Sequence, residues 1–161
     1  MESFVIEGGK ALKGSITPQG AKNEALQILC AVLLTADKIT IHNIPDIVDV
    51  NKLINLLKNL GVKITQLGPG SYQFQSDALD LNYLNSDQFK IDGKGLRGSI
   101  MLVGPLLARF GKGSIPRPGG DKIGRRRLDT HFEGLIQLGA KFNYNKEDYF
   151  YSVEAEKLIG S

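Results

Sequence analysis

The segment PRPGGDKIGRRRLDTH, residues 116–131, sets basic side chains beside a Pro-Gly-Gly turn. Lys122 and the arginine run at residues 125–127 follow this turn, and Asp121 is the carboxylate between the turn and the arginines. Glycines allow close backbone approach to a ligand and leave amide groups free to face an anion. Arginine presents a planar fork of donors that suits phosphate or carboxylate. The segment is therefore a candidate anion site.

The arginine run lies just before or within the first turn of a predicted helix. The helix macrodipole disfavours cations at this end, so helix energetics do not explain residues 125–127. At this level three interpretations stay open: a solvated basic loop, a phosphate site and a nucleic-acid site.

A second set of chemically useful residues lies in GAKN, residues 20–23. Lys22 and Asn23 stand at the mouth of an apolar helix, and Arg97 occupies the corresponding place later in the chain. Lys22, Arg97 and the arginine run at residues 125–127 thus place positive charge at equivalent helix ends. This arrangement indicates that they bind one highly anionic small molecule together.

An internal repeat with a period of about 75 residues relates these positions, a length suited to a duplicated βαβ-type unit. It places Lys22 opposite Arg97 and Gly61 opposite Gly139. The copies diverge most at residues 116–127, and duplicated scaffolds carry function on such divergent loops.

The same elements are predicted in each copy from hydrophobic periodicity. Gly61 and Gly139 are expected to end the second helices with left-handed caps. The predicted elements are a buried helix (26–33 and 100–107), a short strand (39–44 and 113–115), a second helix (50–60 and 128–136) and a hairpin (62–76 and 140–153). We therefore expect a mixed α/β fold of two βαβαββ units, residues 1–85 and 86–161.

Composition fits a soluble globular chain. Of 161 residues, 42% are apolar and 23% charged, with a net charge of +3. No apolar run approaches the ~20 residues of a membrane-spanning helix, and Met1-Glu2 does not begin a signal peptide, so a cytoplasmic location is expected. Cys30, the only cysteine, is expected to pack as a small hydrophobe, and His42 and His131 are expected to pack or lie on the surface. No metal site is expected.

Three blocks, GAKNEALQIL, LRGSIMLVGPLLARFG and PGGDKIGRRRLD, together resemble the enolpyruvyl transferases. The resemblance extends from about Phe4 to about Leu158. It implies an inside-out α/β barrel of two domains, each with three βαβαββ units, and an active site between the domains. This chain would supply two of the units and a mobile active-site loop at residues 116–127.

The resemblance also implies an activity: transfer of the enolpyruvyl group of phosphoenolpyruvate to the 3′-hydroxyl of UDP-N-acetylglucosamine, with release of phosphate. This is the first committed step of peptidoglycan precursor synthesis, and it proceeds by addition and elimination through a tetrahedral ketal without a metal or cofactor. The implied partners are the two substrates and the remainder of the enzyme, with no membrane and no nucleic acid. We expect residues 1–161 alone to be inactive.

The family motifs assign roles to nine residues. Lys22 binds phosphoenolpyruvate and takes part in catalysis, with Asn23 beside it, and Asp121 is the proton donor. The residues matched to UDP-N-acetylglucosamine are Arg97, Arg126, Arg127, Leu128, Asp129 and Thr130.

Two positions depart from the family pattern. Asp121 stands where most members carry a cysteine, and Arg127 replaces the more usual proline. An unperturbed carboxyl has a pKa near 3.9 and a thiol near 8.5. An anionic substrate would raise the pKa of Asp121, whereas Lys122 and Arg125 would lower it. Fosfomycin acts on this family by alkylating that cysteine, so we expect fosfomycin resistance.

Two alternatives remain. The shikimate-pathway enolpyruvyl transferase shares the fold, but the GAKN and PGGDKIG blocks argue against it. An RNA-binding or RNA-end-processing module of related βαβαββ fold would use the arginine run on a phosphate backbone. The aromatic residues lie mostly at alternating strand positions rather than among the arginines, which argues against stacking on bases.

Overall fold

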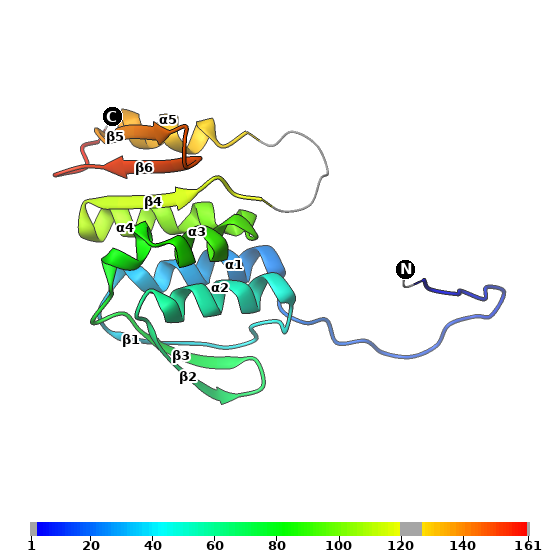
Figure 1. Cartoon of the computed structure of the whole chain (residues 1–161). Helices are drawn as coiled ribbons and strands as arrows, with labels where there is room; N and C mark the ends of the chain where they lie inside the picture. The colour runs from blue at the N-terminus through cyan, green and yellow to red at the C-terminus, as the bar shows by residue number, and fades with distance from the viewer. Residues whose placement is uncertain (1–2, 120–126, 161) are drawn as a thin grey trace.

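A computed structural model of the chain describes residues 3–119 and 127–160 (Figure 1). The α-helices are α1 (Lys22–Ala31), α2 (Val48–Asn59), α3 (Asp87–Lys94), α4 (Val103–Phe110) and α5 (Asp129–Gln137). The 3-10 helices are η1 (Val32–Leu34), η2 (Leu81–Asn85) and η3 (Arg97–Leu102). The strands are β1 (Lys38–Ile41), β2 (Lys63–Gly68), β3 (Ser71–Gln75), β4 (Lys112–Pro116), β5 (Lys141–Asn145) and β6 (Phe150–Glu154).

Two antiparallel sheets of the same design are formed by the described strands. Their strand orders are β1-β3-β2 and β4-β6-β5, so the last strand of each half lies in the centre of its sheet. Ile39 and Ile64 both lie opposite Phe74, and Gly113 and Phe142 both lie opposite Val153. The common topology agrees with the duplicated mixed α/β unit predicted from the repeat.

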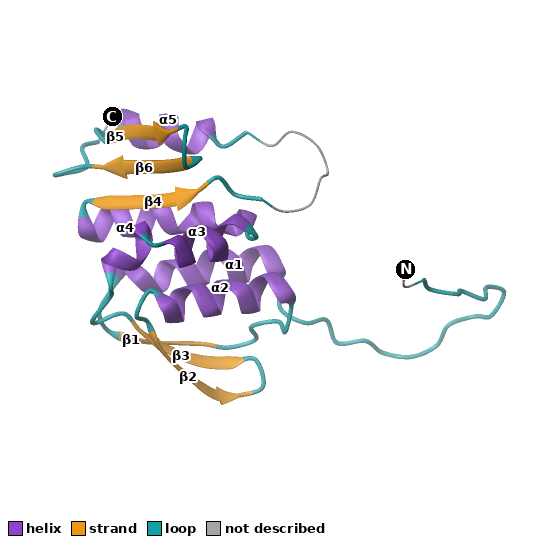
Figure 2. Ribbon diagram, in the orientation of Figure 1, coloured by secondary structure: helices purple, strands orange, loops and turns teal. Residues whose placement is uncertain are grey.

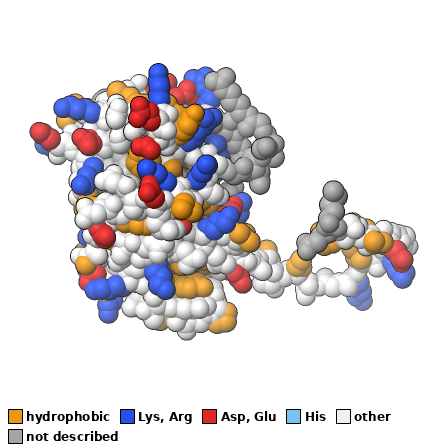
Figure 3. Space-filling model, in the orientation of Figure 1, with side chains coloured by type: hydrophobic (Ala, Val, Ile, Leu, Met, Phe, Trp, Pro, Cys, Tyr) orange, Lys and Arg blue, Asp and Glu red, His pale blue; other side chains and the backbone are white. Residues whose placement is uncertain are grey.

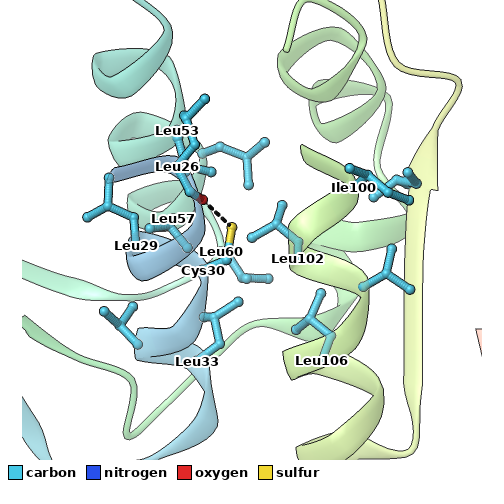
Figure 4. Packing of buried hydrophobic residues seen from close by; sticks show 14 of the residues in the cluster. Leu26, Leu29, Cys30, Leu33, Leu53, Leu57, Leu60, Ile100, Leu102 and Leu106 are labelled. Carbon is cyan, nitrogen blue, oxygen red and sulfur yellow. Dashed lines mark hydrogen bonds between the residues drawn. The ribbon is translucent and has the colours of Figure 1, made fainter. Parts of the chain in front are cut away.

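The helices α1 to α4 lie between the two sheets (Figure 2), and α5 packs beside β5, where Phe132 contacts Phe142 on the face of the β4-β6-β5 sheet that α4 also covers. Leucines from both halves fill the space between the inner helices. Leu102 and Leu106 point towards Cys30 and Leu33 (Figure 4), and all four side chains are at most 1% exposed. One apolar core thus joins the two halves and fixes their helices relative to each other.

Glycines end both second helices, as predicted. Gly61 has φ of +101° and Gly139 has φ of +95°, a backbone region that glycine enters without steric cost. A β-carbon at Gly61 would also come within 2.9 Å of the carbonyl oxygen of Ala78. The turn after α2 therefore requires glycine for both its conformation and its space.

The leading strand expected in each unit does not form in the described residues. Phe4, Val5 and Ile6 belong to an extended segment that runs away from the body of the chain (Figure 1) and are each at least 88% exposed. A strand requires a hydrogen-bonded neighbour, and no described strand lies beside them. In the second half, η2 and α3 precede the buried helix. The predicted unit boundary at residue 85 falls between these two helices and stays a prediction.

A polar junction, which sequence reasoning did not find, joins α2, η2 and α3. Asp92 accepts hydrogen bonds from Tyr83 Oη (2.5 Å), Asn59 Nδ2 (3.0 Å) and Gln88 Nε2 (2.9 Å). Burial opposes ionisation of Asp92, but these three donors outweigh it and lower the pKa of the carboxyl. Burial and the bond to Asp92 raise the pKa of Tyr83. The junction ties the last turn of α2 to the start of the second half.

Cys30 packs as predicted. It is 1% exposed, its Sγ donates to the Leu26 carbonyl oxygen at 3.2 Å, and burial raises the pKa of the thiol far above its ordinary value. His131 is exposed, and His42 Nδ1 lies 3.0 Å from Ser71 Oγ. Within the described part of the chain, no helix is long and apolar enough to span a membrane. No cluster of potential metal ligands occurs there either.

Candidate functional site: a cationic cavity between the two halves

A cavity of about 510 Å³ lies where α1, α2 and the start of η3 meet. It collects polar side chains from both halves of the chain. Its lining consists of Lys22, Asn23, Leu26, Gln27, Asp49, Lys52, Gly95, Arg97, Gly98, Ile100 and Met101. Three predicted site residues, Lys22, Asn23 and Arg97, thus share one hollow, although Lys22 and Arg97 are 75 positions apart in the chain.

Lys22 is the first residue of α1 and points towards α2. Its Nζ lies 2.7 Å from Asp49 Oδ2, and the two side chains are 42% and 35% exposed. A half-exposed pair of this kind contributes little to stability, because water screens both charges. It does hold the ammonium group at the mouth of the cavity, where an anion can compete with Asp49 for it.

The position of Lys22 depends on Gly20. A β-carbon at Gly20 would collide with the carbonyl oxygen of Asn43, so the chain passes closer to the loop after β1 than any other residue would allow. Ala21, the N-cap, is extended and has no side-chain cap, and its carbonyl oxygen accepts from the Ala25 amide at 3.0 Å. The glycine of the GAKN motif therefore brings the start of α1 against the loop.

Arg97 begins η3 as Lys22 begins α1, which matches their equivalence in the repeat. The residues around it are anchored in the core: Leu96 is 1% exposed and Ser99 is fully buried, with its Oγ donating to Gly93 O at 3.4 Å. Gly98 leaves room for the other half, since a β-carbon there would come within 3.1 Å of Leu26 Cδ1. The arginine is thus set at the rim by buried neighbours on both sides.

The predicted nucleotide segment lies elsewhere. Arg127 Nε donates to Asp129 Oδ2 at 2.7 Å, and this bond lowers the pKa of Asp129. Leu128 is the N-cap of α5, Asp129 begins the helix and Thr130 is exposed. None of these four residues lines the cavity. Asp121 and Arg126, the predicted proton donor and the second matched arginine, are outside the described residues, as are Lys122 and Arg125.

Asp49 and Lys52 are the charged residues of this cavity that sequence reasoning missed. They lie three positions apart on α2 and therefore share one helix face. The helix was predicted from its apolar residues alone, and its polar face gave no sign of which side meets α1. The contact between α1 and α2 is what turns these two side chains into cavity residues.

A larger hollow, about 1140 Å³, lies between the end of α4 and the end of β6. The charged residues of its lining are Arg109, Lys112, Lys141, Lys157, Glu154 and Glu156. Glu154 lies opposite both Lys112 and Lys141 across the strands, and the Arg109 guanidinium donates to the carbonyl oxygens of Leu33 and Thr35. Mixed charges also cover much of the face seen in Figure 3. The smaller cavity is the candidate site, because it brings together the predicted site residues Lys22, Asn23 and Arg97.

Solved structures define the class of the fold. The enolpyruvyl transferase NikO from Streptomyces tendae superposes with a TM-score of 0.74 at 18% identity, over 94% of this chain and 32% of that one. An EPSP synthase from Acinetobacter baumannii superposes with a TM-score of 0.64 at 17% identity, over 96% of this chain and 34% of that one. The fold is therefore that of the enolpyruvyl transferases, as predicted.

Residues 6–160 match the family model of EPSP synthase (3-phosphoshikimate 1-carboxyvinyltransferase), and the chain belongs to this family. Its curated relatives include UDP-N-acetylglucosamine 1-carboxyvinyltransferases from three organisms. Identity is 58% for Bacteroides fragilis, 56% for Bacteroides thetaiotaomicron and 40% for Borreliella burgdorferi, each over 100% of this chain. The chain spans 37%, 37% and 36% of the length of these relatives.

Proposed function

We propose that this chain forms part of a transferase that moves the enolpyruvyl group of phosphoenolpyruvate to the 3′-hydroxyl of UDP-N-acetylglucosamine and releases phosphate. The supporting observation is the meeting of Lys22, Asn23 and Arg97 in one cavity between the two halves. The relatives that carry the name of this activity are up to 58% identical across the whole chain. Peptidoglycan precursor synthesis in the cytoplasm is the corresponding setting.

The reaction requires compensation of the negative charges on the carboxylate and on the phosphate of phosphoenolpyruvate. The 3′-hydroxyl loses its proton as its oxygen adds to C2 of phosphoenolpyruvate, and a proton is delivered to C3. Loss of a proton from C3 then breaks the bond between C2 and the phosphate oxygen, which restores the C2–C3 double bond and releases phosphate. Lys22 and Arg97 offset the charge of the carboxylate and the phosphate throughout. Asp121 would deliver the proton as a carboxylic acid, which requires its pKa to rise when the anionic substrate is close. The segment from Arg127 to Thr130 would hold the sugar nucleotide.

A titration of the isotopically labelled chain tests this function. We expect phosphoenolpyruvate to shift the backbone amide resonances of Lys22, Asn23 and Arg97, and UDP-N-acetylglucosamine to shift those of residues 127–130. Shikimate 3-phosphate and single-stranded RNA serve as matched competitors. Selective shifts with either competitor, and none with the proposed substrates, would overturn the proposal.

The aromatic side chains agree with this choice over RNA binding. Phe132, Phe142, Tyr144 and Tyr151 stack on one another, with ring centroids 4.7 to 6.2 Å apart. These rings cover part of one another's surface between α5 and its sheet, which leaves less of it for stacking on bases.

A further inference from the structure

Lys52 adds a third cation to the cavity. It is exposed and lies on α2, three residues after Asp49. Its Nζ would stand 3.9 Å from a β-carbon at Gly95, so the side chain reaches across from α2 to the loop that precedes Arg97. The ammonium group is thereby placed between the halves, on the same hollow as Lys22 and Arg97.

No ion pair or hydrogen bond of Lys52 with another described residue accounts for the position of its side chain. Within residues 3–119 and 127–160, no carboxylate pairs with it, and Asp49 is bonded to Lys22 instead. Lys52 is the fifth residue of α2, beyond its first turn. With Lys22 and Arg97 nearby, the cavity holds three positive side chains and one negative, a local excess of two positive charges. Such an excess costs free energy unless an anion binds there.

We propose that Lys52 is a substrate-binding residue that contacts the phosphate of a small phosphorylated carboxylic acid. This assignment rests on the proposed function, in which phosphoenolpyruvate occupies the cavity. A phosphate ester carries about −1.5 to −2 charges at neutral pH, and the carboxylate adds one more. Lys22 shares its charge with Asp49, so a third cation in the same cavity adds to the charge compensation that Lys22 and Arg97 provide. Lysine suits the task because its ammonium is a compact charge with three rotatable donors.

Binding measurements on three variants test this assignment. Calorimetry with phosphoenolpyruvate, and separately with inorganic phosphate, is carried out on the 161-residue chain and on Lys52→Gln, Lys52→Arg and Lys58→Gln. Lys58 is the matched control, because it lies in the last turn of the same helix and outside the cavity lining. Circular dichroism verifies that each exposed substitution leaves the fold intact.

We expect Lys52→Gln to lower the affinity for both ligands by about three- to tenfold, the range for one charge-assisted contact near a surface. Lys52→Arg keeps most of the affinity, and Lys58→Gln keeps all of it. If the wild-type chain binds and Lys52→Gln binds with the same affinity, this inference is overturned and the proposed function still stands. Equal losses of affinity in Lys52→Gln and Lys58→Gln would overturn it as well, because they would show that only the overall positive potential of the chain matters. A wild-type chain that binds neither ligand would overturn this assignment too, whereas shifts of residues 127–130 with UDP-N-acetylglucosamine would still support the proposed function.

Discussion

At the scale of single residues, the chain separates its thiol from its anion site. Cys30 is 1% exposed and the pKa of its thiol is strongly raised, so the reactive thiolate is scarce and inaccessible. The resemblance predicts that Asp121 stands at the position of the cysteine that fosfomycin alkylates. We therefore expect no covalent adduct when the chain is incubated with fosfomycin and UDP-N-acetylglucosamine and its intact mass is measured.

The matched variant is Asp121→Cys, which restores a thiol on the loop and should gain the mass of one fosfomycin molecule. Unfolding in urea should expose Cys30 to a general thiol reagent, which verifies that its protection comes from burial. A fosfomycin adduct mapped to the wild-type peptide that contains Asp121 would contradict the expectation.

At the scale of elements, the junction at Asp92 couples α2 to α3. The folded pKa of Asp92 is lowered, so its contribution to stability is present above its unfolded pKa of about 3.9 and is lost as the pH falls through the folded value. Asp92→Asn should cost about 1–3 kcal/mol at pH 7, because a charged acceptor of three hydrogen bonds is lost. The difference in the free energy of unfolding between variant and wild type, measured in urea, should be smaller at about pH 3.

Asp87→Asn is the control on the same helix, because Asp87 is 94% exposed and its pair with Lys90 lies on the surface. It should change the free energy of unfolding by less than about 0.5 kcal/mol. A difference for Asp92→Asn that stays constant from neutral to acid pH would show that ionisation of Asp92 is not the cause.

At the scale of the whole molecule, the shared core predicts that the two halves unfold together. Leu102 is fully buried and points from η3 towards α1 (Figure 4). Leu102→Ala should cost about 2–5 kcal/mol, as buried leucine truncations do. Hydrogen exchange should show the amides of β3 and β6 losing the same increment of protection, although only β6 belongs to the half that contains Leu102.

Ile91→Ala is the comparison, because Ile91 is 67% exposed and its truncation should leave exchange in both sheets nearly unchanged. Loss of protection confined to β4, β5 and β6 after Leu102→Ala would mean that the halves unfold independently.

Local signals made much of this architecture predictable. The apolar spacing in α1, α2 and α4, and the glycines at 61 and 139, define helices and their ends through short-range chemistry. The repeat predicted that Lys22 and Arg97 are equivalent, and the cavity shows that they also meet. The contacts of Asp49, Lys52 and Asp92 depend instead on which helix faces which, and a single sequence does not specify that packing. Within residues 3–119 and 127–160 the leading strands do not form, because strand formation depends on a partner strand.

Gly20 has a consequence for how this site tolerates change. The residue contributes no atom beyond the backbone, yet it decides how closely the start of α1 approaches the loop at Asn43. Even one added methyl group would push the helix outward and carry the ammonium of Lys22 away from its carboxylate partner. The electrostatics of the hollow are thus governed in part by a position with no side chain, and a survey restricted to charged residues would overlook it.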